Sequence, residues 1–246
     1  MDLLAALEAR SGVVCVVGAG GKKTTLYTLA EHATAAGLRT VVTATVRIPL
    51  FDAQVARVVT TTEPVAAIES SEDWPLGVVP GREGEHRYGG YDPAVVDELG
   101  ALDGVDLVLV KADGARTREF KAPGDHEPQL PDGAGVVCPI ASVQAVGRPL
   151  DAETVHRPER VGAIADLEPG DRIGPSAIAT VLASPDGGLK GVPSGATAVP
   201  ILNKVDDADA AELGREIATA IHRQTDVPRV VLTSMIGDRP VVDVVT

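Results

Sequence analysis

The sequence feature that most constrains the fold is the glycine-rich run at residues 18–25, Gly-Ala-Gly-Gly-Lys-Lys-Thr-Thr. Before it, residues 13–17 form an unbroken apolar segment, typical of a strand buried on both faces of a parallel sheet. After it, residues 25–36 have the pattern of a helix that ends before Gly37. A strand, a glycine turn, a lysine and a helix in this order predict a phosphate-binding loop, because backbone amides at a helix N-terminus attract anions.

The spacing inside this run leaves the role of each lysine open. Two residues separate Gly18 from Gly21, whereas the standard phosphate-binding pattern has four, so the run resembles the shortened loops of Mur-ligase-type enzymes. If Lys22 contacts the phosphates, Lys23 stands where a magnesium-binding hydroxyl is expected; if Lys23 does, Thr24 supplies that hydroxyl. A plain glycine turn is the alternative, but it leaves the paired lysines unexplained. The predicted phosphate-binding residues are Gly18, Ala19, Gly20, Gly21, Lys22, Lys23, Thr24 and Thr25.

Strand and helix patterns alternate over the rest of the chain. Strands are predicted at residues 13–17, 39–45, 57–61, 77–79, 105–110, 135–140, 197–202 and 229–233. Helices are predicted at residues 25–36, 95–99, 155–165, 175–182 and 207–224, and a loop at residues 80–91. This alternation predicts an α/β fold with a P-loop NTPase-like, mostly parallel sheet and helices on both faces. One domain is expected over residues 1–246, with loop-rich elaborations near residues 62–92 and 112–170.

Charge and composition argue against several classes of protein. The 246 residues carry 35 acidic and 22 basic side chains, a formal net charge of -13, which disfavours a general nucleic-acid binder. No apolar run approaches the roughly 20 residues of a membrane helix, and the N-terminus lacks signal-peptide features, so we expect a cytoplasmic protein without membrane contact. Cys15 and Cys138 lie in apolar stretches and are expected to be buried free thiols.

A second motif, Asn203-Lys204-Val205-Asp206, directly follows the predicted strand at residues 197–202. Guanine-nucleotide proteins carry Asn-Lys-x-Asp at this place, where the carboxylate accepts two N–H groups of guanine. Adenine lacks that pair of donors, so the motif favours GTP, with ATP as the alternative. Ser234 follows the closing strand and resembles the second base-contacting loop of the same proteins. The alternative for the Asn-Lys-Val-Asp motif is a cap of the helix that follows it. The predicted base-binding residues are Asn203, Lys204, Asp206 and Ser234.

Charged residues cluster after the predicted strand at residues 105–110. Asp113 stands where P-loop proteins place a magnesium-positioning carboxylate, so Thr24 and Asp113 are the predicted Mg²⁺ ligands; an ordinary Asp-Gly turn is the alternative. Arg116 is a candidate for stabilising phosphoryl-transfer charge, and with Lys22 and Asp113 it completes the predicted catalytic set. Histidines in this region could ligate a metal or a selenium or sulfur species, but hydrogen bonds that fix rigid loops are the favoured interpretation, and substrate contact stays an alternative. The candidates for binding a substrate or second anion are Lys121, His126, Glu127, His156 and Arg157.

Several longer segments are more specific than the glycine run alone. Residues 111–131 contain Asp-Gly-Ala-Arg and Lys-Ala-Pro-Gly-Asp-His-Glu-Pro, and residues 18–22 read Gly-Ala-Gly-Gly-Lys. With residues 147–150, 155–159, 190–193 and 202–206, these segments resemble the YqeC family of accessory proteins of selenium-dependent molybdenum hydroxylases. The resemblance spans nearly the whole chain. It implies a role in maturation or cofactor assembly of those enzymes, with a nucleotide involved.

By analogy with P-loop GTPases that load cofactors into enzymes, the resemblance implies slow GTP or ATP hydrolysis coupled to delivery. The implied partner is a molybdenum hydroxylase or a selenium or molybdopterin compound. One alternative is a nucleotide-regulated binding or chaperone protein with little turnover; another is an enzyme that activates such a compound with ATP. The chain departs from the family at Lys111, usually an acid, and at Lys23, usually a threonine. Both departures add positive charge near the expected phosphates, so magnesium dependence or turnover is expected to change.

Overall fold

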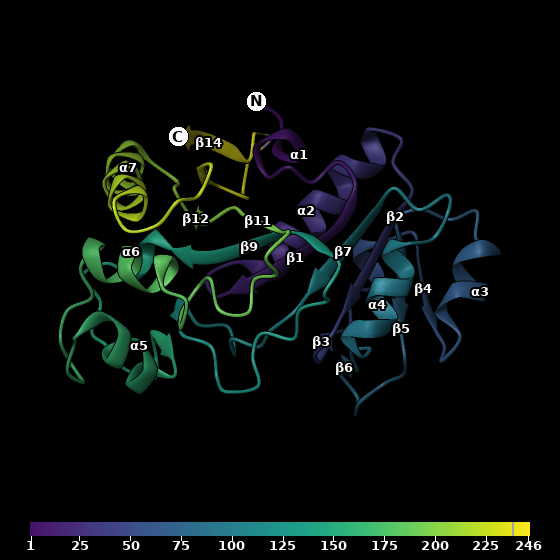
Figure 1. The fold of residues 1–246 in the computed structure, drawn as a ribbon, viewed down its shortest axis with the longest axis horizontal. Coiled ribbons are helices and arrows are strands. Elements are labelled where there is room, and N and C mark those ends of the chain that lie inside the picture. Colours follow the sequence, from purple (N-terminus) through teal and green to yellow (C-terminus); the bar gives the residue numbers. More distant parts are fainter. Residues whose placement is uncertain (238) are drawn as a thin grey trace.

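A ten-stranded sheet forms the centre of the computed structural model, which describes residues 1–237 and 239–246 (Figure 1). The strand order is β14-β13-β12-β9-β1-β7-β2-β5-β4, and β11 also pairs with β9. Every pair is parallel except β13 with β14. The strands are β1 (Gly12–Gly18), β2 (Thr40–Ala44), β4 (Arg57–Thr60), β5 (Leu76–Val79), β7 (Leu107–Lys111), β9 (Ala134–Ser142), β11 (Thr197–Ala198), β12 (Ile201–Asn203), β13 (Val230–Thr233) and β14 (Val241–Val245).

Strand β1 lies at the point where the order of strands across the sheet reverses. It sits between β7 and β9, with β2, β5 and β4 beyond β7 and with β12 and β13 beyond β9. In open α/β sheets, ligands bind in the crevice at the carboxyl ends of the strands beside such a reversal. Val16 pairs with Lys111, and Gly18 pairs with Ile140, so β1, β7 and β9 end at the same edge. The glycine run therefore meets the segments that follow β7 and β9.

Helices cover both faces of the sheet because side chains of each strand alternate between the faces. On one face, Val14 and Val16 pack with Leu26 and Leu29 of the helix after β1. On the other, Cys15 packs in the cluster that holds the helices before β5 and β7. The helices are α1 (Leu3–Ala6), α2 (Lys22–Ala35), α3 (Pro64–Glu69), α4 (Pro93–Gly100), α5 (Pro158–Ala165), α6 (Pro175–Ala183) and α7 (Ala208–His222).

This architecture confirms the predicted α/β fold with a mostly parallel sheet. Cys15 and Cys138 are both free and buried, as expected. No helix in the described part of the chain is long and apolar enough to cross a membrane.

Two small sheets stand at the carboxyl edge of the large one. Strands β3 (Ile48–Pro49) and β6 (Arg87–Tyr88) pair antiparallel, and β8 (Phe120–Lys121) pairs in parallel with β10 (Val155–His156). Neither sheet was predicted from the sequence. A loop was expected at residues 80–91, where β6 lies, and a helix was expected at residues 155–165, where β10 lies. Strands of two residues carry no readable alternation, and their pairing depends on contacts far apart in the sequence.

The helix predicted at residues 155–165 is wrong at its beginning. Val155 and His156 are extended in β10, and Arg157 adopts a left-handed conformation with φ of 64°. Helix α5 then begins at Pro158, whose fixed φ suits the first helical position and whose missing N–H needs no partner there. The strand pairing with β8 overrides the apolar spacing from which the longer helix was predicted.

The strand predicted at residues 197–202 is also wrong, because it is divided into β11 and β12. Pro200 stands between the two pieces and has no N–H to donate to a neighbouring strand. The chain continues along β9 through the Val199 N–H, which donates to the Val137 carbonyl at 2.9 Å. Helix α3 and the antiparallel edge strand β14 were not predicted at all.

The packing of α6 on the sheet can be tested by truncating Ile178, which is fully buried. Ile178→Ala is expected to lower the free energy of unfolding by about 2–5 kcal/mol, because a cavity replaces the lost side-chain atoms. Ile236 is 84% exposed, so Ile236→Ala removes the same atoms at a cost of less than ~0.5 kcal/mol. Urea denaturation measures both values, and equal losses would contradict the burial of α6.

Candidate functional site

The glycine run forms a tight turn that only glycine can make. Gly18, Gly20 and Gly21 have φ angles of 92°, 84° and 136°, which side chains other than hydrogen rarely allow. A Cβ atom at Gly18 would lie 2.2 Å from the Ile140 carbonyl oxygen, and one at Gly21 would lie 2.0 Å from the Asn203 side-chain nitrogen. The turn is therefore pressed against the ends of β9 and β12.

The amides of the first three loop residues are used within the protein. Helix α2 begins at Lys22, three residues before the predicted start at Thr25, and its first helical bond runs from the Thr25 N–H to the Gly21 carbonyl, at 3.0 Å. The four amides from Gly21 to Thr24 precede that bond and have no partner within the helix. They are the amides left for an anion. The amides of Gly18, Ala19 and Gly20, in contrast, already have partners within the protein. The Gly18 N–H donates to Asp113 Oδ2 at 2.8 Å, the Ala19 N–H to the Ile140 carbonyl at 2.8 Å and the Gly20 N–H to the Arg118 carbonyl at 2.9 Å.

The two adjacent lysines have different environments. The Lys22 side chain is 6% exposed and folds beneath the loop, where its Nζ donates to the Gly18 carbonyl and lies 3.0 Å from Asp113 Oδ1. Lys23 is half-buried and lines the cleft in front of the loop, together with the exposed Thr24. Lys22 thus supports the loop from inside, while Lys23 and Thr24 face the solvent side. Thr25 is fully buried.

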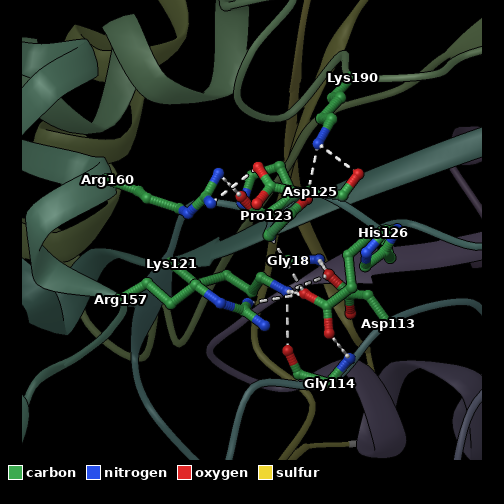
Figure 2. Close-up of polar contacts among 12 residues, drawn as sticks. Gly18, Asp113, Gly114, Lys121, Pro123, Asp125, His126, Arg157, Arg160 and Lys190 are labelled. Atoms are coloured by element: carbon green, nitrogen blue, oxygen red, sulfur yellow. Dashed lines mark hydrogen bonds and ion pairs between the residues drawn. The ribbon is translucent and has the colours of Figure 1, made fainter.

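Asp113 is a buried carboxylate surrounded by positive charge (Figure 2). Its Oδ2 accepts the Gly18 N–H at 2.8 Å and lies 2.8 Å from Lys121 Nζ, while Oδ1 faces Lys22 Nζ at 3.0 Å. Burial acts to raise the pKa of Asp113, but the ammonium groups of Lys22 and Lys121 outweigh it and lower that pKa below its usual value. Asp113 is therefore ionised, and its Oδ1 lies beside the Lys22 ammonium without accepting a hydrogen bond.

The network continues from Lys121 to Glu127 and Arg157 (Figure 2). Lys121 Nζ lies 2.8 Å from Glu127 Oε2 and donates to the Gly114 carbonyl at 2.7 Å. Arg157 Nη1 also binds Glu127 Oε2, at 2.7 Å. Burial acts to raise the pKa of Glu127, but Lys121 and Arg157 overcome it and bring that pKa to about 2. These residues join β8, β10 and the segment after β7 into one charged unit.

The segment that carries Glu127 is anchored on its other side (Figure 2). Arg160 of α5 pairs with Asp125 at 2.8 Å, and Lys190 Nζ donates to the Gly124 carbonyl at 2.6 Å. His126 is exposed and lies outside the cleft lining. His156 lines the cleft, where burial and the Arg157 charge lower its pKa to about 4, so it is neutral at pH 7.

A cleft of about 690 Å³ opens between the two small sheets, in front of the N-terminus of α2. The chain as a whole has a formal charge of -13, so this concentration of positive charge is local. A concave surface of one sign focuses the electric field and attracts oppositely charged ligands. Among the described residues, nine basic side chains and two acidic ones line the cleft: Lys22, Lys23, Arg47, Arg87, Lys111, Arg116, Arg118, Arg157 and Lys204, with Glu119 and Glu127.

Lys111, at the end of β7, forms the floor of this cleft. Its side chain is 6% exposed, and its Nζ donates to the Arg47 carbonyl at 2.8 Å. Burial and then the nearby Lys22 charge lower the pKa of Lys111 to about 7. A bound anion would favour the protonated amine, because an opposite charge raises the pKa of a lysine.

The Asn-Lys-Val-Asp segment is joined directly to the glycine loop. The Asn203 amide donates to the Gly20 carbonyl at 2.8 Å and its oxygen accepts the Thr233 hydroxyl at 3.0 Å. Lys204 lines the cleft and pairs with Glu119 at 2.7 Å. Asp206 accepts the Ser234 hydroxyl at 2.6 Å, and both lie outside the cleft lining. The structure therefore brings Asn203 and Lys204 to the loop, and leaves the Asp206–Ser234 pair beside the cleft.

The residues present do not fit the magnesium ion that the P-loop pattern implies. Mg²⁺ takes oxygen ligands, often one or two carboxylates together with phosphates, and both oxygens of Asp113 already face ammonium groups or the Gly18 amide. Thr24 lines the cleft, whereas Asp113 is 1% exposed behind it, so the two predicted ligands do not face one space. Within the described part of the chain, no three His, Cys, Asp or Glu side chains are grouped to hold a metal ion. The magnesium site stays a prediction.

Comparison with known proteins gives the family. The sequence model of the family described as "YqeC protein" matches residues 14–159, more than half of the chain. The chain belongs to the YqeC family. A relative in Escherichia coli (strain K12), described as "Uncharacterized protein YqeC", is 28% identical over 222 residues, which cover 89% of this chain and 86% of the relative. This match confirms the resemblance inferred from the sequence, and the glycine loop, Asp113, Lys121, Glu127 and Arg157 all lie within the matched residues.

Several cleft residues escaped the sequence analysis because no motif marks them. Arg47 directly precedes β3 and Arg87 lies in β6, 40 residues apart in the numbering, and the sheet that brings them together was not predicted. Arg118 belongs to the cluster of basic residues that the sequence already showed after residue 110, whereas Glu119 beside it carried no signal of its own.

The tightness of the glycine turn can be tested with two alanine variants. Gly12 and Gly18 both have positive φ, 75° and 92°, but a Cβ at Gly12 meets nothing within 4 Å. Gly12→Ala is expected to lose ~1–2 kcal/mol of unfolding free energy from backbone strain. Gly18→Ala should lose about 1–3 kcal/mol more, because its Cβ collides with the Ile140 carbonyl. Chemical denaturation of the pair checks this difference; its absence would contradict the close packing.

The Glu127 ion pairs should be visible in acid. The folded-state pKa of about 2 is below the ordinary value of 4.5, so Glu127 stabilises the fold above about pH 4.5 and loses this contribution as pH falls towards 2. The lost free energy is on the order of 3 kcal/mol. Glu127→Gln is expected to flatten the fall in unfolding free energy between pH 5 and pH 2, while the exposed Glu216→Gln keeps the wild-type curve. Parallel curves for wild type and Glu127→Gln would refute the assignment.

Proposed function

We propose that the cationic cleft binds the phosphates of a nucleotide, and that the protein uses this nucleotide in the maturation of selenium-dependent molybdenum hydroxylases. One observation carries the proposal: nine basic side chains converge on the N-terminus of α2 in a chain whose net charge is -13. A helix N-terminus with free amides already favours an anion, and the surrounding charge strengthens that preference. A polyphosphate is the cellular anion that matches this density of positive charge.

The position of the cleft supports the same proposal. It lies at the carboxyl edge of the sheet beside β1, where the strand order reverses. This is the place where α/β proteins bind nucleotides. Membership in the YqeC family supports the link to hydroxylase maturation, with a molybdenum hydroxylase or a selenium or molybdopterin compound as the partner.

The Asn-Lys-Val-Asp segment supports GTP ahead of ATP. Asn203 binds the Gly20 carbonyl, so the segment is fixed relative to the glycine loop, and Asp206 carries the carboxylate that guanine would need. To reach a base, Asp206 would exchange its Ser234 hydroxyl for the guanine N–H groups. The preference rests on this motif, and ATP stays the alternative.

A second candidate function is a nucleotide-regulated binding protein with little turnover. Both acidic side chains that line the cleft are ion-paired, Glu119 with Lys204 and Glu127 with Lys121 and Arg157. A carboxylate whose charge is shared with a cation is a weak general base for activating water. This observation favours slow hydrolysis or none, and nucleotide binding would then control contact with the partner.

Nucleotide binding can be tested with Arg116, which is exposed on the cleft wall. Arg116→Met is expected to weaken binding of fluorescent GTP or ATP about tenfold or more, because one charge-assisted contact to phosphate is lost. Arg57→Met removes the same charge from strand β4, outside the cleft lining, and should leave the affinity within about twofold. Failure of the unmodified protein to bind either nucleotide would end the proposal.

The two candidate functions differ in turnover. Steady-state release of phosphate from GTP and ATP, measured with magnesium and with a chelator, separates them. Detectable release that follows nucleotide affinity supports a slow hydrolase. Tight binding without release supports the nucleotide-regulated binding protein.

A further inference from the structure

We infer that the cleft binds its polyphosphate without a divalent metal ion, and that lysine ammonium groups supply the positive charge that Mg²⁺ supplies in ordinary P-loop proteins. The inference rests on the proposed nucleotide site and deepens it. Four of the six lysines of the chain line the cleft, Lys22, Lys23, Lys111 and Lys204, and a fifth, Lys121, lies in the charged network behind it.

The first step concerns the carboxylate that would hold the metal. Asp113 is 1% exposed, and its oxygens face Lys22 at 3.0 Å, Lys121 at 2.8 Å and the Gly18 amide at 2.8 Å. A dication approaching Asp113 would meet two ammonium groups at close range, and like charges repel. The negative charge of Asp113, which would otherwise balance a metal ion, is already balanced by the two lysines.

The second step concerns the other acidic side chains that line the cleft. Glu119 binds Lys204 at 2.7 Å, and Glu127 binds both Lys121 at 2.8 Å and Arg157 at 2.7 Å. Each carboxylate is therefore shared with a cation before any ligand arrives. Mg²⁺ is normally held by one or two free carboxylates together with the phosphates. In the described lining of this cleft, both carboxylates are already ion-paired.

The third step concerns Lys111, which stands on the cleft floor at the end of β7. Its Nζ donates to a neutral carbonyl, that of Arg47 at 2.8 Å, and so has no carboxylate to neutralise it in that contact. A lysine with its charge uncompensated is a phosphate ligand, because the ammonium acts as a point charge on a phosphate oxygen. Lys111 thus places an amine at the end of β7, on the cleft floor, where a bound phosphate would hold it in its protonated form.

The test is equilibrium binding of GTP, ATP and inorganic tripolyphosphate to the full chain, once with excess magnesium chloride and once with a chelator. We expect the affinity measured in the chelator to equal the affinity measured in magnesium within ~3-fold, or to be higher, since the free polyphosphate carries more negative charge than its magnesium complex. A loss of about tenfold or more on chelation would overturn the inference. Absence of binding under both conditions would overturn the proposed function as well, so the two failures are distinguishable.

Variants at Lys111 show whether the ammonium group itself replaces the metal. Lys111→Met is expected to weaken binding in the chelator about tenfold or more, and Lys111→Arg should retain it, because the arginine keeps the charge. Lys111→Glu places a carboxylate at the cleft floor and should make binding depend on magnesium. Circular dichroism and the unfolding midpoint check that each variant is folded.

Lys23→Met provides a second route, because Lys23 lies at the start of α2, half-buried on the cleft wall, and its loss leaves the buried network intact. It should weaken binding equally with and without magnesium. If Lys23→Met and Lys111→Met both bound the polyphosphate in the chelator as tightly as the unmodified protein does, these ammonium groups would not supply the charge, and the inference would be wrong.

Discussion

The site depends on one buried carboxylate. Asp113 follows β7, and its oxygens gather the Gly18 amide from the glycine turn, Lys22 from α2 and Lys121 from β8. Opposite unit charges ~4 Å apart attract by about 4 kcal/mol at an effective dielectric constant of ~20, and loss of one partner from a buried pair costs about 3–5 kcal/mol. Asp113 therefore holds the turn, helix α2 and the small sheet of β8 and β10 in place relative to one another, and the shape of the cleft follows from that.

Much of this arrangement could be predicted from the sequence, because local patterns carry it. The valine-rich strand, the three glycines and the start of a helix identified the loop, and Asn203 lies against it in the structure. Long-range pairing could not be predicted. The strand at Val155–His156 exists because β8 lies beside it, and the proline at residue 200 divides a strand whose apolar pattern looked continuous. The engagement of Asp113 by two lysines also depended on distant segments, so its position suggested a metal ligand.

The distribution of charge links the fold to the proposed function. The chain is acidic overall, yet its few lysines are concentrated at the edge where β1, β7 and β9 end. An acidic exterior repels polyanions in general, whereas the cationic cleft attracts one that fits between the small sheets. The Asn203 contact ties the glycine loop to the end of β12, so a ligand that moves the loop would also move the Asn-Lys-Val-Asp segment. This coupling offers a route from nucleotide binding to contact with a partner.

The most direct measurement is a crystal structure of the protein with a non-hydrolysable GTP analogue, grown without divalent metal. The account predicts that the β- and γ-phosphates lie in front of the amides from Gly21 to Thr24, with Lys23 and Lys111 in contact with phosphate oxygens. It also predicts that Asp113 keeps its bonds to Gly18 and Lys121. An analogue bound outside the cleft, or density for phosphates that appears only when a metal ion bound through Asp113 is present, would contradict the account.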